Sequence, residues 1–394
     1  MLRGATIICF GSIDWAFNWQ PPQEIATAFA ASGNHVLFVE NTGVRRPSLK
    51  DAGRLRDRFR AWRDADHGIR AESKGLDILP PLLVPLPYSR LAVRANRHVL
   101  LRTVRRWLKS NGSAPLIVIT FLPTPLVREV IAELDPALVV YYCIDRLPES
   151  SPGARKLLEP ERALLAEADV VLTTSNGLRT MAEEHAPHVE LLECGVRSGE
   201  FARARDGSAA PEVFESLPRP VIGFAGSLRN ELDIALLCDA AELAPDLTFL
   251  FAGPVMADVK RLASYPNVRL IGSLPHADVI RHTVHFDAGI LPYVRNVFTA
   301  YIMPAKLKEY LAAGLPVVST TLPEVVRFAE EHPGMITFAD DAAGFVAALR
   351  AAVASNTREA AARRMAVART FDWSEQISRM SELIEAALAA KRAS

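Results

Sequence analysis

A pair of charged side chains near the start of one short helix is the strongest candidate for binding chemistry. Lys306 and Glu309 lie three positions apart in MPAKLKEYLAAGLPVVS, so they share one face of the predicted helix. Leu307, Leu311 and Ala312 form the stripe that would pack inward. A polar helix start beside a buried parallel strand is where α/β domains hold a charged ligand. An ordinary amphipathic helix on a sheet would show the same pattern.

A glycine turn offers a second place for an anion. In GFAGSLR, Gly226 permits close backbone approach, Ser227 supplies a hydroxyl and an amide, and Arg229 supplies a cation. A plain strand-to-helix turn is the alternative interpretation.

Two carboxylates at strand ends are candidates for proton transfer. Asp145 closes an apolar run and is followed by Arg146, and a carboxylate there could act as a general base. The same residue could cap its loop or pair with Arg146. Asp14 is the second candidate, with Gly11 and Ser12 before it in the loop after the first predicted strand.

Short aliphatic runs alternating with helical patterns must position these residues. Such runs are typical of parallel strands buried on both faces, with right-handed crossovers. They predict an α/β protein with doubly wound sheets. The predicted strands are 6–10, 35–39, 116–120, 137–142, 170–173, 189–192, 221–225, 247–251, 268–271, 288–291 and 316–318.

The length of 394 residues favours two domains, because one hydrophobic core rarely serves so long a chain. A segment rich in small residues and proline lies between 203 and 220. We therefore predict a first domain over 1–205, a second over 206–372, and a final helix over 373–394. That helix keeps Ile377, Met380, Ile384 and Leu388 on one face.

The passage around Glu309, with its phrase EYLAAGLPVV, resembles the sugar-nucleotide half of group 1 glycosyltransferases of the GT-B fold, especially those of surface-polysaccharide or teichuronic-acid biosynthesis. The resemblance implies two Rossmann-like domains facing across a cleft, with the C-terminal helix crossing back. It also implies that Glu309 contacts the donor's ribose and that Arg229 faces the donor phosphates. The chain has Tyr301 where the family often has a second glutamate, and Glu231 near the place of a phosphate-binding lysine. Lys306 is our candidate for that missing charge.

The residue patterns and the resemblance together give the full set of candidate site residues. The catalytic assignments are Asp145, Arg229 and Lys306, and the acceptor side contains Gly11, Ser12 and Asp14. The donor-binding assignments are Gly226, Ser227, Gly253, Pro254, Ser273, Leu274, Tyr293, Pro304, Ala305 and Glu309.

The implied reaction is transfer of a sugar from a nucleoside diphosphate, UDP- or GDP-linked, to a carbohydrate or lipid-linked acceptor. The family usually retains anomeric configuration and needs no bound metal or other cofactor. Two alternatives stay open. One is a sugar-nucleotide epimerase of the same fold, and the other is a noncatalytic sugar-nucleotide-binding subunit, which Tyr301 and Glu231 favour.

Charge is unevenly distributed along a chain whose net charge is zero. Residues 45–109 hold 17 Lys and Arg against 6 Asp and Glu. Their helical stretch, 88–109, carries Leu91, Leu101, Val104 and Leu108 as a predicted stripe among arginines, which suits an anionic membrane surface. A helix packed on the sheet with solvated arginines fits equally well. No nucleic-acid-binding module is recognisable.

Four widely spaced cysteines, Cys9, Cys143, Cys194 and Cys238, predict buried free thiols in a reducing compartment. The start, MLRGATIICFGS, predicts a first strand and not a signal peptide. We expect a cytoplasmic protein, either free or peripheral on the inner face of the membrane.

Overall fold

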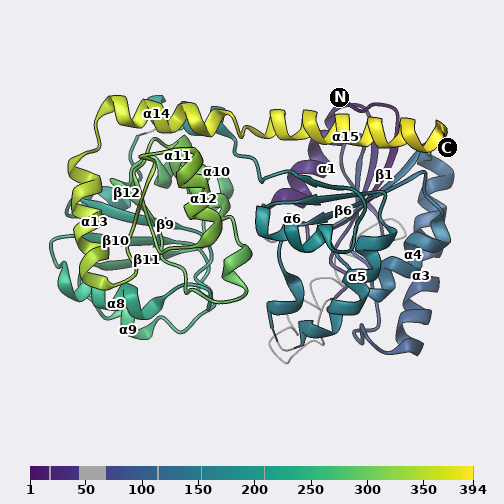
Figure 1. The fold of residues 1–394 in the computed structure, drawn as a ribbon, viewed down its shortest axis with the longest axis horizontal. Helices are drawn as coiled ribbons and strands as arrows, with labels where there is room; N and C mark the ends of the chain where they lie inside the picture. The colour runs from purple at the N-terminus through teal and green to yellow at the C-terminus, as the bar shows by residue number, and fades with distance from the viewer. Residues whose placement is uncertain (17–18, 44–67, 113–114, 152, 208, 394) are drawn as a thin grey trace. The chain divides into compact units, whose positions relative to one another are not determined.

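The computed structural model describes residues 1–16, 19–43, 68–112, 115–151, 153–207 and 209–393 (Figure 1). The chain divides into two compact units, each built on its own sheet. Unit 1 contains residues 1–192 and 376–394, and unit 2 contains residues 193–375.

Unit 1 is a parallel sheet with one antiparallel edge strand. Its order is β3-β4-β2-β1-β5-β6-β7-β8, and β3 pairs antiparallel with β4. Its strands are β1 (Thr6–Phe10), β2 (His35–Val39), β3 (Arg70–Ser73), β4 (Leu76–Leu79), β5 (Leu116–Thr120), β6 (Leu138–Cys143), β7 (Val170–Thr173) and β8 (Val189–Leu191). Its helices are α1 (Pro21–Ala31), α3 (Arg90–Asn111), α4 (Pro125–Leu134), α5 (Leu158–Glu167), α6 (Asn176–Glu183), and the single turns η2 (Leu147–Glu149) and η3 (Ala154–Leu157).

Unit 2 has six parallel strands in the order β11-β10-β9-β12-β13-β14, which is the Rossmann order. Its strands are β9 (Val221–Ala225), β10 (Thr248–Ala252), β11 (Val268–Gly272), β12 (Ala288–Leu291), β13 (Val317–Ser319) and β14 (Ile336–Phe338). Its helices are α7 (Ser198–Gly207), α8 (Ile234–Leu243), α9 (Lys260–Ala263), α10 (His276–Thr283), α11 (Ala305–Ala312), α12 (Pro323–Glu331), α13 (Ala342–Ala354) and α14 (Arg358–Arg369), with η4 (Glu212–Glu215) and η5 (Thr299–Tyr301).

Alternate side chains of the unit 2 strands fill two cores. Ile222 and Phe249 pack with α8 and α13 on one face, whereas Val221 and Leu250 pack with α7 and α11 on the other. Burial on both faces accounts for the continuous aliphatic runs from which the strands were predicted. The prediction of doubly wound α/β units is confirmed.

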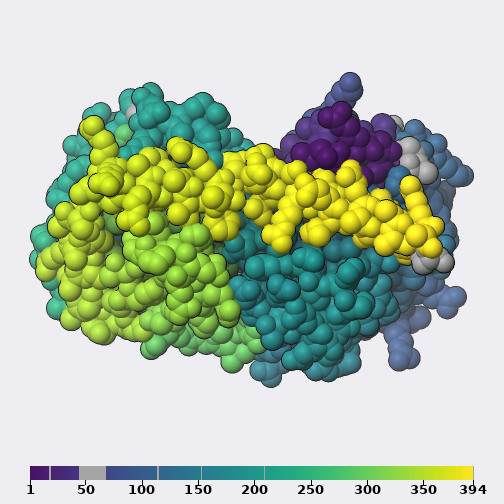
Figure 2. All heavy atoms as spheres, turned by 45° about the horizontal axis from the view of Figure 1, so that its top comes forward, coloured from purple at the N-terminus to yellow at the C-terminus, as the bar shows by residue number. Residues whose placement is uncertain are grey.

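The last helix, α15 (Trp373–Ala393), begins in unit 2 and packs for most of its length on unit 1. The predicted apolar face is buried at Ile377, Met380, Ile384 and Leu388. Lys391 Nζ lies 2.7 Å from an Asp169 carboxylate oxygen. In Figure 2 this helix, in yellow, lies at the surface, and its outer face is not covered by other elements of the described chain.

The contact boundaries differ from those predicted from sequence. The chain passes between units at 192/193 and 375/376, whereas the sequence suggested 205/206 and 372/373. The segment between 193 and 205 belongs to unit 2 because Phe201 and Ala204 of α7 join the unit 2 core.

The predicted apolar stripe of α3 is correct only in part. Leu101 and Val104 are buried, but Leu91 is 83% exposed. The other buried positions of this helix include Val93, Leu100 and Trp107. Trp107 fixes this orientation, since its Nε1–H donates to Asp77 at 2.7 Å. The part of the basic segment at 44–67 lies outside the described residues.

Candidate functional site

The loops after β9 and β12 meet at the point where the strand order of unit 2 reverses. Ligands of doubly wound sheets bind at this position, outside the carboxyl ends of the strands. An isolated bridge joins Leu232 to Tyr293, and another joins Leu228 to Val255 after β10. The loop residues chosen from sequence around β9, β10 and β12 are therefore one connected edge.

Lys306 of α11 reaches the turn after β9. A Cβ added to Gly226 would lie 2.5 Å from Lys306 Nζ, and the ammonium lies 5.4 Å from the centroid of the Phe224 ring. Gly226 has φ +152°, and any side chain there would displace the lysine. The glycine is thus needed for the approach of Lys306, a role that its own sequence context did not reveal.

The charges around Lys306 favour an anion. Burial lowers the pKa of Lys306, the Glu309 carboxylate opposes that shift, and the Arg229 guanidinium adds to it. Two cations that destabilise each other are relieved by a bound anion, which is what a diphosphate would supply. The structure brings the charges of Lys306, Glu309 and Arg229 together, and their role toward a ligand stays a prediction.

Two backbone amides of the glycine turn, on either side of Ser227, are used within the fold. The Gly226 N–H donates to the Ala252 carbonyl at 2.7 Å, and the Leu228 N–H donates to the Pro254 carbonyl at 2.9 Å. These amides hold the loops after β9 and β10 together. The charge that an anion would meet here therefore comes chiefly from the side chains of Lys306 and Arg229.

Tyr310 anchors α11 to the same turn, and the sequence analysis missed it. Its hydroxyl accepts the Ala225 N–H at 3.1 Å, and its ring packs where a Cβ on Gly289 would be only 2.5 Å away. Gly289 of β12 therefore leaves the space that this ring fills. The aromatic residue after Glu309 is the one signal that could have suggested it.

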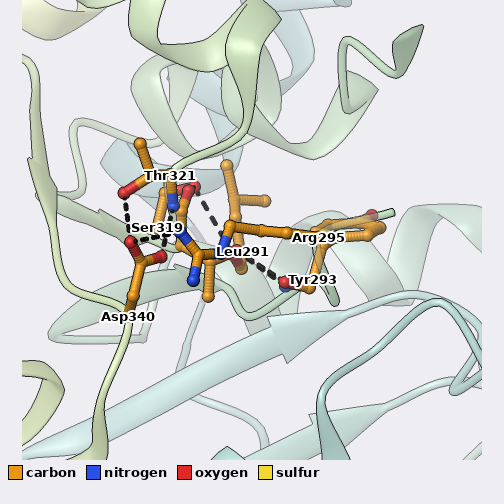
Figure 3. Close-up of polar contacts among 7 residues, drawn as sticks. Leu291, Tyr293, Arg295, Ser319, Thr321 and Asp340 are labelled. Atoms are coloured by element: carbon orange, nitrogen blue, oxygen red, sulfur yellow. Dashed lines mark hydrogen bonds and ion pairs between the residues drawn. The ribbon is translucent and has the colours of Figure 1, made fainter. Parts of the chain in front are cut away.

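The loop that begins at Tyr293 is held from the neighbouring strands (Figure 3). The Thr320 hydroxyl donates to the Tyr293 carbonyl at 2.8 Å, and Asp340 accepts from both the N–H and the hydroxyl of Thr321. Arg295 Nη1 lies 3.1 Å from Asp340. Burial raises the pKa of Asp340, but the Thr321 hydrogen bonds and the Arg295 charge outweigh it and lower the pKa overall.

The remaining donor-side candidates lie at different distances from this centre. A Cβ on Gly253 would be 2.1 Å from the Gly226 carbonyl, so Gly253 and Pro254 border the turn directly. Pro304 is the N-cap residue of α11, and Ala305 is its first residue. Ser273 and Leu274 follow β11, two strands from β9, and they stay predictions.

The acceptor-side candidates of unit 1 also lie at a strand-order reversal, after β1. Gly11 is required for packing, because a Cβ there would lie 2.3 Å from the Phe38 ring. The Ser12 hydroxyl is buried without a hydrogen-bond partner among the described residues. Asp14 follows in the same loop and is partly buried.

Asp145 follows β6, two strands from β1, and its main chain is well held. The Asp145 carbonyl accepts the Leu147 N–H at 2.9 Å and the Cys143 thiol at 3.7 Å. Earlier in the chain, within β6, the Tyr141 hydroxyl donates to Glu161 at 2.7 Å. Burial raises the pKa of Glu161 to about 7, against the Tyr141 hydrogen bond and the Arg146 charge.

The raised pKa of Glu161 predicts a pH-dependent stability. Because the folded-state pKa lies above the ordinary 4.5, the folded protein favours the neutral carboxyl of Glu161. Its contribution to the free energy of unfolding is complete below pH 4.5 and is lost as the pH rises through 7. Glu161→Gln cannot ionise, so relative to wild type it should gain about 3 kcal/mol of unfolding free energy across that interval. Urea unfolding at pH 5 and pH 8 would measure this. Glu167→Gln, an exposed residue of the same helix, is the control, and an equal response in both variants would contradict the expectation.

Comparisons with known proteins bear on the class of this chain. Residues 219–355 match the family model described as glycosyl transferases group 1. The putative teichuronic acid biosynthesis glycosyltransferase TuaH of Bacillus subtilis (strain 168) is 28% identical over 284 residues, covering 67% of this chain and 70% of that protein.

Two solved structures share the fold over nearly the whole chain. The Anabaena protein HepE in complex with UDP has a TM-score of 0.66 at 14% identity, with 97% of this chain and 100% of that chain covered. WaaG, a glycosyltransferase involved in lipopolysaccharide biosynthesis, has a TM-score of 0.60 at 14% identity, with coverage of 96% and 99%.

The matched domain, the TuaH relative and the shared fold support a group 1 glycosyltransferase with the GT-B fold. The chain is thus a transferase enzyme by class, and the family resemblance seen in its sequence is confirmed.

Proposed function

We propose that the protein transfers a hexosyl group from a UDP- or GDP-linked donor to a lipid-linked or polysaccharide acceptor, with retention of configuration. The convergence of Lys306, Arg229 and Glu309 at the strand-order reversal of unit 2 carries this proposal. The names of TuaH and WaaG, which refer to teichuronic acid and lipopolysaccharide, support an acceptor of that kind.

The chemistry assigns a role to each group. As the bond between the sugar and the diphosphate breaks, Lys306 and Arg229 neutralise the charge that accumulates on the leaving phosphate. Glu309 accepts hydrogen bonds from the ribose, and Asp145 accepts or orients the proton of the acceptor hydroxyl. We propose that these side chains suffice without a resident metal or other cofactor, the nucleotide sugar being a co-substrate.

Calorimetry and thermal-shift measurements with UDP, GDP, CDP and dTDP test the donor site, since a ligand of the native state raises its stability. Slow donor hydrolysis without acceptor, with and without EDTA, then tests for transfer. Tight nucleotide binding with no turnover would favour the noncatalytic subunit. Conversion of one nucleotide sugar into its epimer would favour the epimerase.

Glu309→Ala should weaken nucleotide binding and leave the fold intact. A hydrogen bond to a charged group contributes about 1.5–3 kcal/mol, so the dissociation constant for the nucleotide should rise about 10- to 150-fold. Calorimetry measures the constant, and Glu330→Ala on the surface of α12 is the control. Unchanged affinity would remove Glu309 from the site.

We further propose that α3 binds an anionic membrane surface on the cytoplasmic side. The outer face of α3 carries an open, shallow pocket lined by basic side chains, among them Arg94, Arg102 and Arg106. Leu91 and Val99 are 83% and 51% exposed on the same helix. A basic helix with exposed apolar residues is suited to the interface of an anionic bilayer.

The segment before α3 adds apolar surface to this face. Leu82, Val84 and Leu86 are exposed. The Asn96 side chain accepts the Val84 N–H at 2.8 Å and donates to the Val84 carbonyl at 2.9 Å. The exposed segment is therefore held against the basic helix. None of the helices in the described part of the chain has the length and apolar character of a membrane span.

Replacing Arg94, Arg102 and Arg106 by glutamine should release the protein from anionic vesicles. Each arginine near the surface contributes about 1 kcal/mol, so binding should weaken on the order of 100-fold. Vesicle sedimentation over a salt series measures this. A control with the same charge change replaces Arg162, Arg179 and Arg350, which lie in exposed ion pairs elsewhere. Equal binding to neutral and anionic vesicles would exclude the mechanism.

A further inference from the structure

A fully buried lysine lies on the side of α11 away from Lys306. The side chain of Lys308 is 0% exposed, and its ammonium donates to the Cys194 carbonyl at 3.1 Å. It also lies 3.4 Å from a Glu193 carboxylate oxygen and 4.3 Å from the centroid of the Phe371 ring. Burial lowers the pKa of Lys308, and Glu193 opposes this shift.

These partners belong to the two segments where the chain passes between its units. We call residues 193–198 and 371–375 the crossing segments, because the units divide at 192/193 and 375/376. The Val196 N–H donates to the Phe371 carbonyl, and the Trp373 N–H donates to the Val196 carbonyl. Asp372 accepts from both the N–H and the hydroxyl of Ser198.

Packing makes the crossing segments a tight pair. A Cβ on Gly195 would lie 2.6 Å from the Trp373 indole, so this position accepts only a residue without a side chain. Lys308 contacts both segments, through Cys194 and Glu193 on one and Phe371 on the other. It therefore joins α11 to the paired segments.

Burying an ammonium is costly, and an apolar residue of similar size would often be as stable. Stability alone thus gives a weak reason for a lysine at this position. Successive residues of a helix are about 100° apart, so Lys308 points away from Lys306, with the rigid backbone of α11 between them. A displacement of the helix at Lys306 must also displace Lys308.

We propose that Lys308 is a positioning residue that ties the donor end of α11 to the crossing segments, so that occupancy of the donor site changes their order. This inference rests on the proposed donor site. The coupling is reciprocal, because two events that share one free energy influence each other equally. The crossing segments therefore also set the position of Lys306 and Glu309.

Hydrogen exchange measured by mass spectrometry tests the coupling in the full-length protein, with UDP or GDP as the probe, whichever binds. In wild type, saturating nucleotide should slow exchange of the Val196 and Trp373 amides by about 5-fold or more. Lys308→Met should lose this protection, and because the coupling is reciprocal its dissociation constant, from calorimetry, should rise by a similar factor of about 5-fold. Lys260→Met, on the exposed helix α9, should behave as wild type.

Glu193→Gln is a second variant, which tests the coupling if Lys308→Met does not fold. It removes the charge of Glu193 but keeps the contact of Lys308 with the Cys194 carbonyl. We expect it to reduce in part the protection that nucleotide gives to the Val196 and Trp373 amides. Nucleotide binding without any change of exchange in wild type, or full protection in the variant that folds, would overturn the coupling alone. Failure of every nucleotide to bind in calorimetry would instead overturn the donor site.

Discussion

Lys306→Ala should lower turnover at saturating donor by about 10²–10³, the range seen when one group that stabilises developing charge is removed. Its ammonium lies over the Phe224 ring beside Gly226 and Arg229, at the edge where the phosphates are proposed to bind. Negative charge on the phosphate grows as the sugar departs, so the loss should exceed the loss of ground-state affinity.

Donor hydrolysis and nucleotide calorimetry on the same preparations separate the two effects. Lys260→Ala provides a lysine control from the same unit. Wild-type turnover in the Lys306 variant would show that this cation does not act on the leaving group. A fall in affinity as large as the fall in turnover would indicate uniform binding only.

Asp145→Asn should lower transfer by about 10² or more, because the amide keeps the shape of the carboxylate and loses its basicity. The main chain of Asp145 is held by Leu147 and Cys143, so the substitution should not displace the loop. Nucleotide affinity should hardly change, since the proposed donor site belongs to unit 2.

Transfer to acceptor and nucleotide affinity are the two measurements. Asp135→Asn is a matched control in unit 1, since Asp135 has a left-handed φ of 45°, which asparagine tolerates. Normal transfer by the Asp145 variant would identify this carboxylate as a loop residue.

Much of the fold could be predicted from sequence because its signals are local. Strands such as Thr6–Phe10 and Val221–Ala225 are buried on both faces, and their aliphatic runs therefore match the observed bounds. Gly314 ends α11 with φ +76°, a conformation that glycine adopts without strain. By contrast, β3 has the sequence RAES, and only its pairing with β4 makes it a strand.

The sequence by itself determined the two doubly wound units, the placement of Lys306 and Glu309 on one face of α11, and the glycine turn before Arg229. Each depends on spacing within one element. Only the tertiary structure decided that Lys306 meets Gly226, that the Gly226 amide is already used by Ala252, and that Lys308 is buried. These outcomes depend on strand order and on contacts between residues far apart in the chain. A helical pattern shows which residues share a face, but the surrounding elements decide which face is covered.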